Sequence, residues 1–260
     1  MVELVKYHVN CIFLVMQTIL FQDMGKMPYD IAWSHQETLM QANLQVKARR
    51  YNTDETTGLT EEGDTTHHLL FCEHPHVYTL GKSGHMENLL VNDARLKELN
   101  VSFFKTNRGG DITYHGPGQI VGYPILDLEK FETDLGKYMR HLEEAIINTL
   151  KHYGIESGRL PGSTGVWLDA DIKGKARKIC AMGVKCSRWV TMHGLALNVN
   201  TDLKYFDYIV PCGITDKSVT SMQKELGHEV NEQEIKDLLR TEFGKVFNAE
   251  IITGKAMLVA

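Results

Sequence analysis

The chain has 260 residues, 43% of them hydrophobic, and a formal net charge of −5 at pH 7. This length and apolar content are enough for the core of one large globular domain or two small ones. The acidic balance argues against general nucleic-acid binding, and the apolar stretch near the N-terminus is too short to span a bilayer. The five cysteines form an odd set with no close metal spacing, which indicates free thiols in a reducing, cytoplasmic compartment.

The first strand is expected at residues 18–23, shortly after Met16. We therefore interpret residues 1–15 as an N-terminal extension added by an early start codon; an extra edge strand or a short amphipathic arm is the alternative. Residues 31–48 place apolar side chains roughly on one helical face, which predicts the first long helix. Residues 52–66 carry five acidic and no basic residues, and such a composition is typical of an inserted acidic loop.

Strands and helices follow in runs along the rest of the chain. Helical periodicity extends over residues 134–153 and 232–247, with Asp134 and Asn231 as N-caps. Short apolar runs predict strands at 69–72, 77–80, 101–104, 120–126, 166–168, 178–184 and 195–199. Because the strands come mostly in succession with few helices between them, we expect an α+β fold with a mixed sheet flanked by helices.

Residues 108–124 read RGGDITYHGPGQIVGYP, with five glycines and two prolines. Glycine weakens helices and strands, so the segment is either a turn-rich hairpin or the wall of a ligand site. Phosphate binding is disfavoured, because the last three glycines miss the dinucleotide spacing by one residue. The LGKS run at residues 80–83 lacks the first glycine of a P-loop, which would fall at His76.

Two residues outside that segment are candidates for catalysis. Cys212 stands between a proline and a glycine, a tight-loop setting unlike that of structural cysteines, so it is the best candidate nucleophile. Lys178 lies in an otherwise apolar strand run, which favours a functional role over a solvated charge. Cys72, His74 and His76 alternate too regularly for a zinc site, so no metal is expected.

Several separated motifs, in order, resemble the lipoyl(octanoyl) transferase family. They are RGGDITYHGPGQIVGYP, RKICAMGVK, SRWVTMHGLALNVN and VPCGI, together with EHPHVYTLG and TGVW. The resemblance covers about residues 23–247 and implies a biotin/lipoate protein ligase-like fold, with residues 16–260 as a single catalytic domain. It also implies Cys212 as the acyl-accepting nucleophile, Lys178 as its partner, and no cofactor. The residues that it implies for the acyl site are Arg108, Gly109, Gly110, Asp111, Ile112, Thr113, Tyr114, His115, Ala181, Met182, Gly183, Gly194, Leu195 and Ala196.

The family reaction moves an octanoyl or lipoyl group from acyl carrier protein to a lysine of a lipoyl domain. The implied acceptors are the lipoyl domains of 2-oxoacid dehydrogenases and the glycine cleavage H protein. An acid-free stretch at residues 172–190 contains Lys173 and Lys175, and we expect it to attract the acidic carrier. Two alternatives stay open: an ATP-dependent lipoate or biotin ligase, and a non-catalytic module that binds lipoyl domains or acyl groups.

The residues alone are compatible with this chemistry. A cysteine with a pKa of ~8.5 is only a few per cent thiolate at pH 7. An ammonium group from Lys178 beside Cys212 would need to supply only about 2 to 3 kcal/mol to make the thiolate the major form. His115 and His193 are as well explained by loop-holding hydrogen bonds as by proton transfer.

Overall fold

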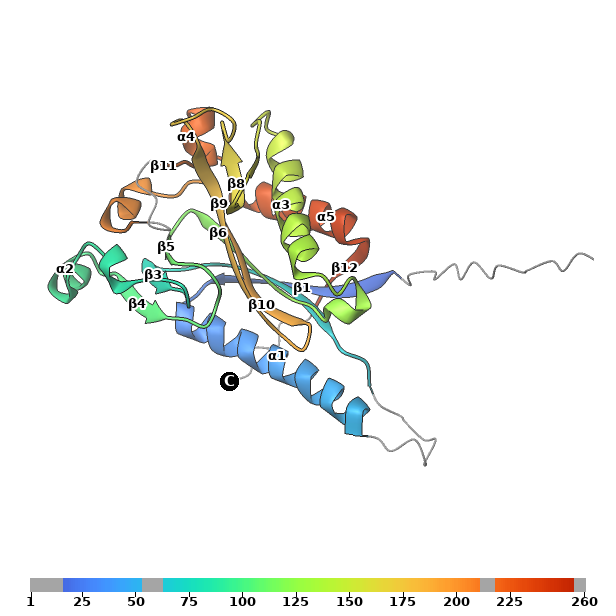
Figure 1. The fold of residues 1–260 in the computed structure, drawn as a ribbon. Helices are drawn as coiled ribbons and strands as arrows, with labels where there is room; N and C mark the ends of the chain where they lie inside the picture. Colours follow the sequence, from blue (N-terminus) through green and yellow to red (C-terminus); the bar gives the residue numbers. More distant parts are fainter. Residues whose placement is uncertain (1–15, 53–62, 211–217, 255–260) are drawn as a thin grey trace, which may run out of the picture.

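The structure, a computed structural model, describes residues 16–52, 63–210 and 218–254 (Figure 1). Its main sheet has nine strands in the order β12-β1-β2-β6-β10-β9-β8-β7, with β11 paired to β9. These strands are β1 Gln17–Lys26, β2 His67–Glu73, β6 Gln119–Ile125, β7 Gly158–Leu160, β8 Ser163–Leu168, β9 Arg177–Ser187, β10 Val190–Asn198, β11 Ser218–Val219 and β12 Ala249–Thr253. A second sheet has the order β4-β3-β5, formed by β4 Ser102–Lys105, β3 Val77–Leu80 and β5 Ile112–His115.

The helices are α1 Tyr29–Asn52, α2 Asp93–Glu98, α3 Leu135–Lys151, α4 Met222–Leu226 and α5 Glu232–Phe247, with short 3₁₀ turns η1 Met86–Asn88, η2 Leu128–Lys130 and η3 Leu203–Tyr208. The long helices lie on the two faces of the main sheet, α1 on one face and α3 with α5 on the other, whereas α2 packs with the small sheet (Figure 1). Helix α1 connects β1 to its parallel neighbour β2, as a parallel pair requires. Because β2, β6, β10 and β9 then pair antiparallel, the sheet is mixed and the expected α+β class is confirmed.

Alternation of side chains along the strands builds the two cores. On β2, Leu69 and Phe71 pack with α3 and α5, whereas Leu70 and Cys72 pack on the α1 side. Successive residues of a strand point to opposite faces, so one apolar run serves both layers. A third apolar cluster joins the small sheet to η3 through Tyr78, among others.

A buried ion pair fixes the end of α1. Lys47 Nζ lies 2.6 Å from Asp127 Oδ1 and 2.8 Å from Glu129 Oε2, and the Lys47 side chain is 2% exposed. Burial opposes the charge on Lys47, but its hydrogen bonds to both carboxylates hold its pKa above the ordinary value. Thr65 donates to the second oxygen of Asp127 at 3.0 Å. Thr65 therefore belongs to the fold, although the sequence places it in the acidic loop.

Most sequence expectations for elements agree with the structure. The N-caps are confirmed: Asp134 accepts from the amide of Lys137, and Asn231 accepts from that of Gln233. Helix α1 runs on to Asn52, past the predicted end. A strand, β5, lies inside the glycine-rich segment, where only turns or a ligand wall were expected. The acidic loop over 53–62 and the proposed extension over 1–15 lie outside the described residues.

Candidate active site

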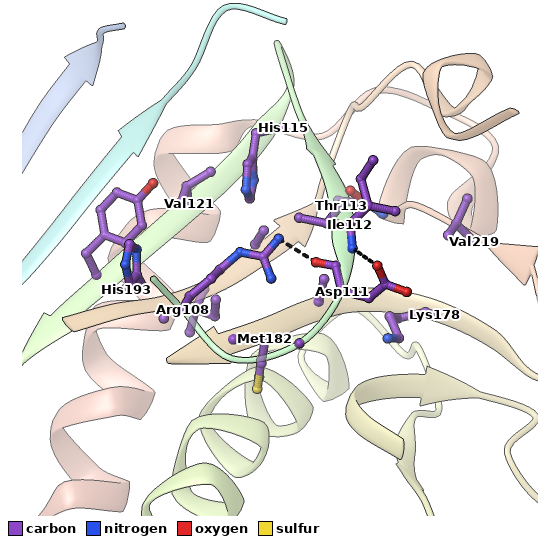
Figure 2. Close-up of a pocket in the computed structure, with 18 of the residues that line it drawn as sticks. Arg108, Asp111, Ile112, Thr113, His115, Val121, Lys178, Met182, His193 and Val219 are labelled. Atoms are coloured by element: carbon purple, nitrogen blue, oxygen red, sulfur yellow. Dashed lines mark hydrogen bonds between the residues drawn. The ribbon is translucent and has the colours of Figure 1, made fainter. Parts of the chain in front are cut away.

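A pocket lies between the glycine-rich segment with β5 and the strands β6, β9 and β10 (Figure 2). The structure brings together here most of the residues that the sequence singled out. They are Arg108, Gly110, Asp111, Ile112, Thr113, His115, Lys178, Ala181, Met182, Gly183, Gly194, Leu195 and Ala196. The walls are mainly apolar, and the polar groups are few and fixed, as in small-molecule sites.

Two of the expected site residues that the structure describes are not part of this lining. Tyr114 faces the other side of β5, where its hydroxyl contacts His76 Nδ1 at 2.7 Å. Alternation along the strand explains this, because Thr113 and His115 point the opposite way. Gly109 contributes its backbone, with its amide donating to the Val184 carbonyl at 2.8 Å. Cys212 lies outside the described residues.

The lining also contains His193, which the sequence analysis weighed together with His115, and residues that the sequence did not assign to the site. The latter are Tyr29, Val121, Tyr123, Asn198, Phe206 and Val219. Alternation in the strand predicted at 120–126 places Val121 and Tyr123 on one face, so that pair could have been found together. Tyr29 and Phe206 come from segments far away in sequence, and no local signal marks them.

The Arg108 guanidinium group folds the glycine-rich segment back on β3. It donates to the Thr79 carbonyl at 2.7 Å, to the Thr79 hydroxyl at 2.9 Å and to the Asp111 carbonyl at 2.8 Å. Another nitrogen donates to its neighbour Gly109 at 3.0 Å. Arg108 is thus a buried brace for the pocket wall, with its donors directed at backbone and hydroxyl oxygens.

Glycine is needed where the pocket walls approach each other. A Cβ atom at Gly183 would lie 2.7 Å from the Gly109 carbonyl oxygen. One at Gly194 would overlap the Gly122 carbonyl on the neighbouring strand. The glycines of two distant motifs therefore serve one purpose, close contact between backbones around the pocket.

Lys178 stands at one end of the pocket (Figure 2). Its ammonium nitrogen lies 4.6 Å from the centre of the Trp167 ring, a cation–π contact. The backbone of Lys178 pairs with that of Val219 on β11. The lysine is therefore held between β8 and the strand that follows the segment containing Cys212.

His115 is a buried neutral imidazole. Gln119 Nε2 donates to Asn198 Oδ1 at 2.9 Å, so Gln119 Oε1 faces His115 Nδ1 at 2.8 Å and accepts its proton. Burial, the neighbouring His74 and the charge of Arg108 lower the pKa of His115 to about 3. At physiological pH His115 is therefore an uncharged part of the pocket wall.

The chain just before residues 211–217, which are not described, is anchored to the site. The Val210 amide donates to the Asn88 carbonyl at 2.8 Å, and the Asn88 side chain donates to Asp111 Oδ2 at 2.6 Å. Upstream, the Tyr205 ring stacks on His76 with centroids 4.1 Å apart. The residues just before Cys212 are thus tied to the glycine-rich segment.

His74, two residues after Cys72, is held by hydrogen bonds at both of its ring nitrogens. His74 Nδ1 donates to the Met27 carbonyl at 2.9 Å, so its Nε2 accepts from the Tyr123 hydroxyl at 2.8 Å. Both imidazole nitrogens are then used. In the part of the chain that is described, no three His, Cys, Asp or Glu side chains gather as metal ligands. Nor is any helix there long and apolar enough to span a membrane.

The fold and the pocket define a catalytic domain of the lipoyl protein ligase class. The family model of the lipoyl protein ligase A/B catalytic domain matches residues 28–244. A crystal structure of lipoate-protein ligase A bound with ATP has a TM-score of 0.62 at 16% identity, covering 94% of this chain and 90% of that one. A bipartite lipoate protein ligase from Thermoplasma acidophilum has a TM-score of 0.61 at 16% identity, covering 93% and 87%. At these identities the likeness establishes the fold alone.

Relatives with much higher sequence identity identify the family within this class. An octanoyltransferase of Flavobacterium johnsoniae is 56% identical, covering 90% of this chain and 98% of the relative. Octanoyltransferases of Christiangramia forsetii and Bacteroides thetaiotaomicron are 55% and 50% identical, covering 88% and 90% of this chain and 96% of each relative. The chain belongs to the octanoyltransferase family.

Proposed function

We propose that this protein transfers an octanoyl group from acyl carrier protein to a lysine of lipoyl domains, through a thioester on Cys212. The observation that carries the proposal is an apolar, glycine-walled pocket with Lys178 at one end, in a chain that belongs to the octanoyltransferase family. Such a pocket suits an acyl chain, with its reacting carbonyl beside the ammonium group.

Chain connectivity supports a pairing of Cys212 with Lys178. Cys212 is two residues beyond Val210, so their Cα atoms are at most ~7 Å apart. Val210 is anchored to Asn88, and the chain returns at Ser218 and Val219 beside Arg177 and Lys178. The described chain thus stops near Asn88 and resumes beside Lys178, and this supports the proposed pairing.

In the first half-reaction the Cys212 thiolate attacks the carbonyl carbon of the octanoyl thioester on the carrier. A new carbon–sulfur bond forms to Cys212, and the bond to the carrier sulfur breaks. The Lys178 ammonium stabilises the thiolate before attack and gives a proton to the departing carrier thiolate. Lys178 is left neutral.

In the second half-reaction the ε-amine of the acceptor lysine attacks the acyl-enzyme thioester. An amide bond forms, the Cys212 sulfur leaves as a thiolate, and the surplus proton of the attacking nitrogen passes to the neutral Lys178. Both groups then return to their starting charges. No ATP is needed, because the energy for the amide bond comes from the thioester.

The donor and acceptor proteins would meet the surface near Lys178. Lys173 and Lys175 are exposed on the turn that leads into β9, whereas Arg177 is already paired with Glu225 at 2.8 Å. Lys173 and Lys175 are thus better candidates than Arg177 for attracting an acidic carrier. Reversal of both charges should slow transfer severalfold at low salt and little at high salt; unchanged kinetics at low salt would remove this role.

The experiment that tests the function is transfer to an isolated apo lipoyl domain, followed by its intact mass. Octanoyl-acyl carrier protein without ATP should add one octanoyl group. Free octanoate with ATP should add none. Modification only in the second mixture would make the protein a ligase, and modification in neither would make it a binding module.

A further inference from the structure

Strand β8 contains the TGVW motif, residues 164–167, to which the proposed reaction assigns no role. Strands β8 and β9 lie side by side (Figure 1), and Trp167 on β8 pairs with Lys178 on β9. The register shifts between Val166 and Trp167, and without this shift Trp167 would stand opposite Ile179. Irregularities of this kind re-aim side chains beside active sites. The shift therefore places one aromatic ring next to the proposed acid–base group.

The Lys178 side chain lies along β8. A Cβ atom at Gly165 would lie 3.6 Å from Lys178 Cε and 2.5 Å from the Cys180 carbonyl oxygen. Gly165 also has a φ of +110°, which favours glycine. The ammonium nitrogen of the lysine lies 4.6 Å from the centre of the Trp167 ring. Gly165 thus leaves room for the lysine stem, and the ring of Trp167 receives its charged end.

The ring and its strand are held in place. Trp167 is 3% exposed, and its backbone pairs with Gly158 on β7. From α3, the fully buried carboxylate of Glu143 accepts the Gly165 amide proton at 3.0 Å. A buried ring on a braced strand offers the cation a fixed face.

The acidic side chains around this corner are paired with arginines. Glu143 contacts Arg159 at 3.0 Å, and both Asp169 and Glu225 contact Arg177. An aromatic face differs from these carboxylates, because it attracts an ammonium group through its quadrupole and adds no negative charge. A ring can therefore hold the lysine without competing with a thiolate for it.

We propose that Trp167 is a positioning residue for acyl transfer: its ring face holds the Lys178 ammonium group at the end of the pocket and favours the charged form. This inference rests on the proposed role of Lys178 and adds the group that directs it. The ammonium group is then in place when Cys212 ionises. The neutral amine left by the first half-reaction is favoured to take up the proton of the attacking lysine in the second.

Fluorination of the indole tests this contact with little change in its shape, because fluorine withdraws electron density from the ring face. The protein is produced with tryptophan, 5-fluorotryptophan or 5,6,7-trifluorotryptophan. Competitive acetylation between about pH 7 and 11, read by peptide mass spectrometry, gives the protonation midpoint of each lysine. We expect the midpoint of Lys178 to fall by about 0.3 to 1 pH unit in the trifluorinated protein. Lys151, exposed on α3, should keep its midpoint.

The matched control is Trp167→Phe, because the label enters all three tryptophans of the wild type. In this variant only Trp33 and Trp189 carry fluorine, so the Lys178 midpoint should be independent of the label. An unchanged midpoint in the labelled wild type overturns the inference, and so does an equal fall in labelled Trp167→Phe. This measurement uses no substrate and does not depend on transferase activity.

The pH profile of transfer connects the contact with the reaction. The upper pKa of the kcat/KM profile reports the essential acid of the free enzyme, so it should fall with fluorination by the same amount as the Lys178 midpoint. An upper limb that stays in place while the midpoint moves would also overturn the inference. The proposed function fails on a different result, when unlabelled wild type does not transfer plain octanoyl.

Discussion

The backbone of Val219 pairs in parallel with that of Lys178, and the Thr220 amide donates to the Lys178 carbonyl at 2.9 Å. This short contact returns the segment that contains Cys212 to the strand that contains Lys178. The two residues are 34 positions apart in sequence, and the chain that follows the Cys212 segment resumes beside Lys178. The chemical proposal depends on this relationship.

Removal of the Lys178 charge should raise the pKa of the Cys212 thiol and lower kcat. In Lys178→Met we expect kcat to fall by about 10² to 10⁴, the usual contribution of a positioned acid–base group. The pH midpoint of Cys212 alkylation should rise toward the ordinary thiol value of ~8.5. Lys151→Met, at an exposed site on α3, is the control. A wild-type alkylation profile in Lys178→Met would show that the lysine does not activate the thiol.

Gly183 is predicted to be irreplaceable for steric reasons. A Cβ there would lie 2.7 Å from the Gly109 carbonyl, and the backbone of the pocket wall would have to shift. Gly183→Ala should destabilise the protein by about 1 to 3 kcal/mol and reduce transfer. Gly158→Ala is the matched control, since a Cβ there has nothing within 4 Å. Urea unfolding measures the stability of the two variants. Equal midpoints for Gly183→Ala and Gly158→Ala would contradict the steric account.

The buried Lys47–Asp127 pair should be costly to break from one side. Lys47→Met leaves the Asp127 carboxylate buried without its cation, and we expect a loss of about 3 to 5 kcal/mol. The additional change Asp127→Leu should recover part of that loss, because the buried carboxylate is then removed and only the more exposed Glu129 lacks its cation. Lys26→Met is the control: Lys26 pairs with Glu73, but its side chain is 80% exposed, so its removal should change stability far less than Lys47→Met. Thermal unfolding of wild type, Lys47→Met, the double variant and Lys26→Met measures these losses of stability.

Stability should decline below neutral pH because of buried neutral histidines. Burial lowers the pKa of His68 and of His74 to about 4, below the ordinary value near 6.5. Between these values the unfolded chain binds a proton that the folded chain does not, so unfolding becomes easier as pH falls from about 6.5 to 4. Each histidine contributes up to about 1.4 kcal/mol per pH unit in this window.

Urea unfolding at pH 7, 6 and 5 measures this slope. In His68→Gln, the change of unfolding free energy with pH should be smaller by the contribution of one histidine. His228→Gln, at an exposed position, should keep the wild-type slope. If stability is the same at pH 7 and pH 5, the histidines are not neutral in the folded protein.

The strands and the helices α3 and α5 were predictable because they are periodic, and both helices are well capped, at Asp134 and Asn231. The face of α1 was not, because its buried side contains Gln36, Asn43 and Lys47 while Ile31 is exposed. The site residues were predictable from motifs, but their orientation was less so. Tyr114 was assigned to the pocket although alternation on β5 turns it away, since the strand itself was hidden by the surrounding glycines. Tyr29 and Phe206 reach the pocket only through tertiary contacts. The contact of His193 Nε2 with Asn107 Oδ1 joins two segments that no sequence pattern connects.

The central claim is that the acyl group passes through a thioester on Cys212. The most direct measurement is the intact mass of the protein after brief mixing with octanoyl-acyl carrier protein, without acceptor and without ATP. Wild type should gain the mass of one octanoyl group, which hydroxylamine removes and which peptide mapping locates at Cys212, and Cys212→Ser should gain no such labile adduct. An unmodified wild-type protein that nevertheless transfers octanoyl to a lipoyl domain, or an adduct that persists in Cys212→Ser, would contradict the account.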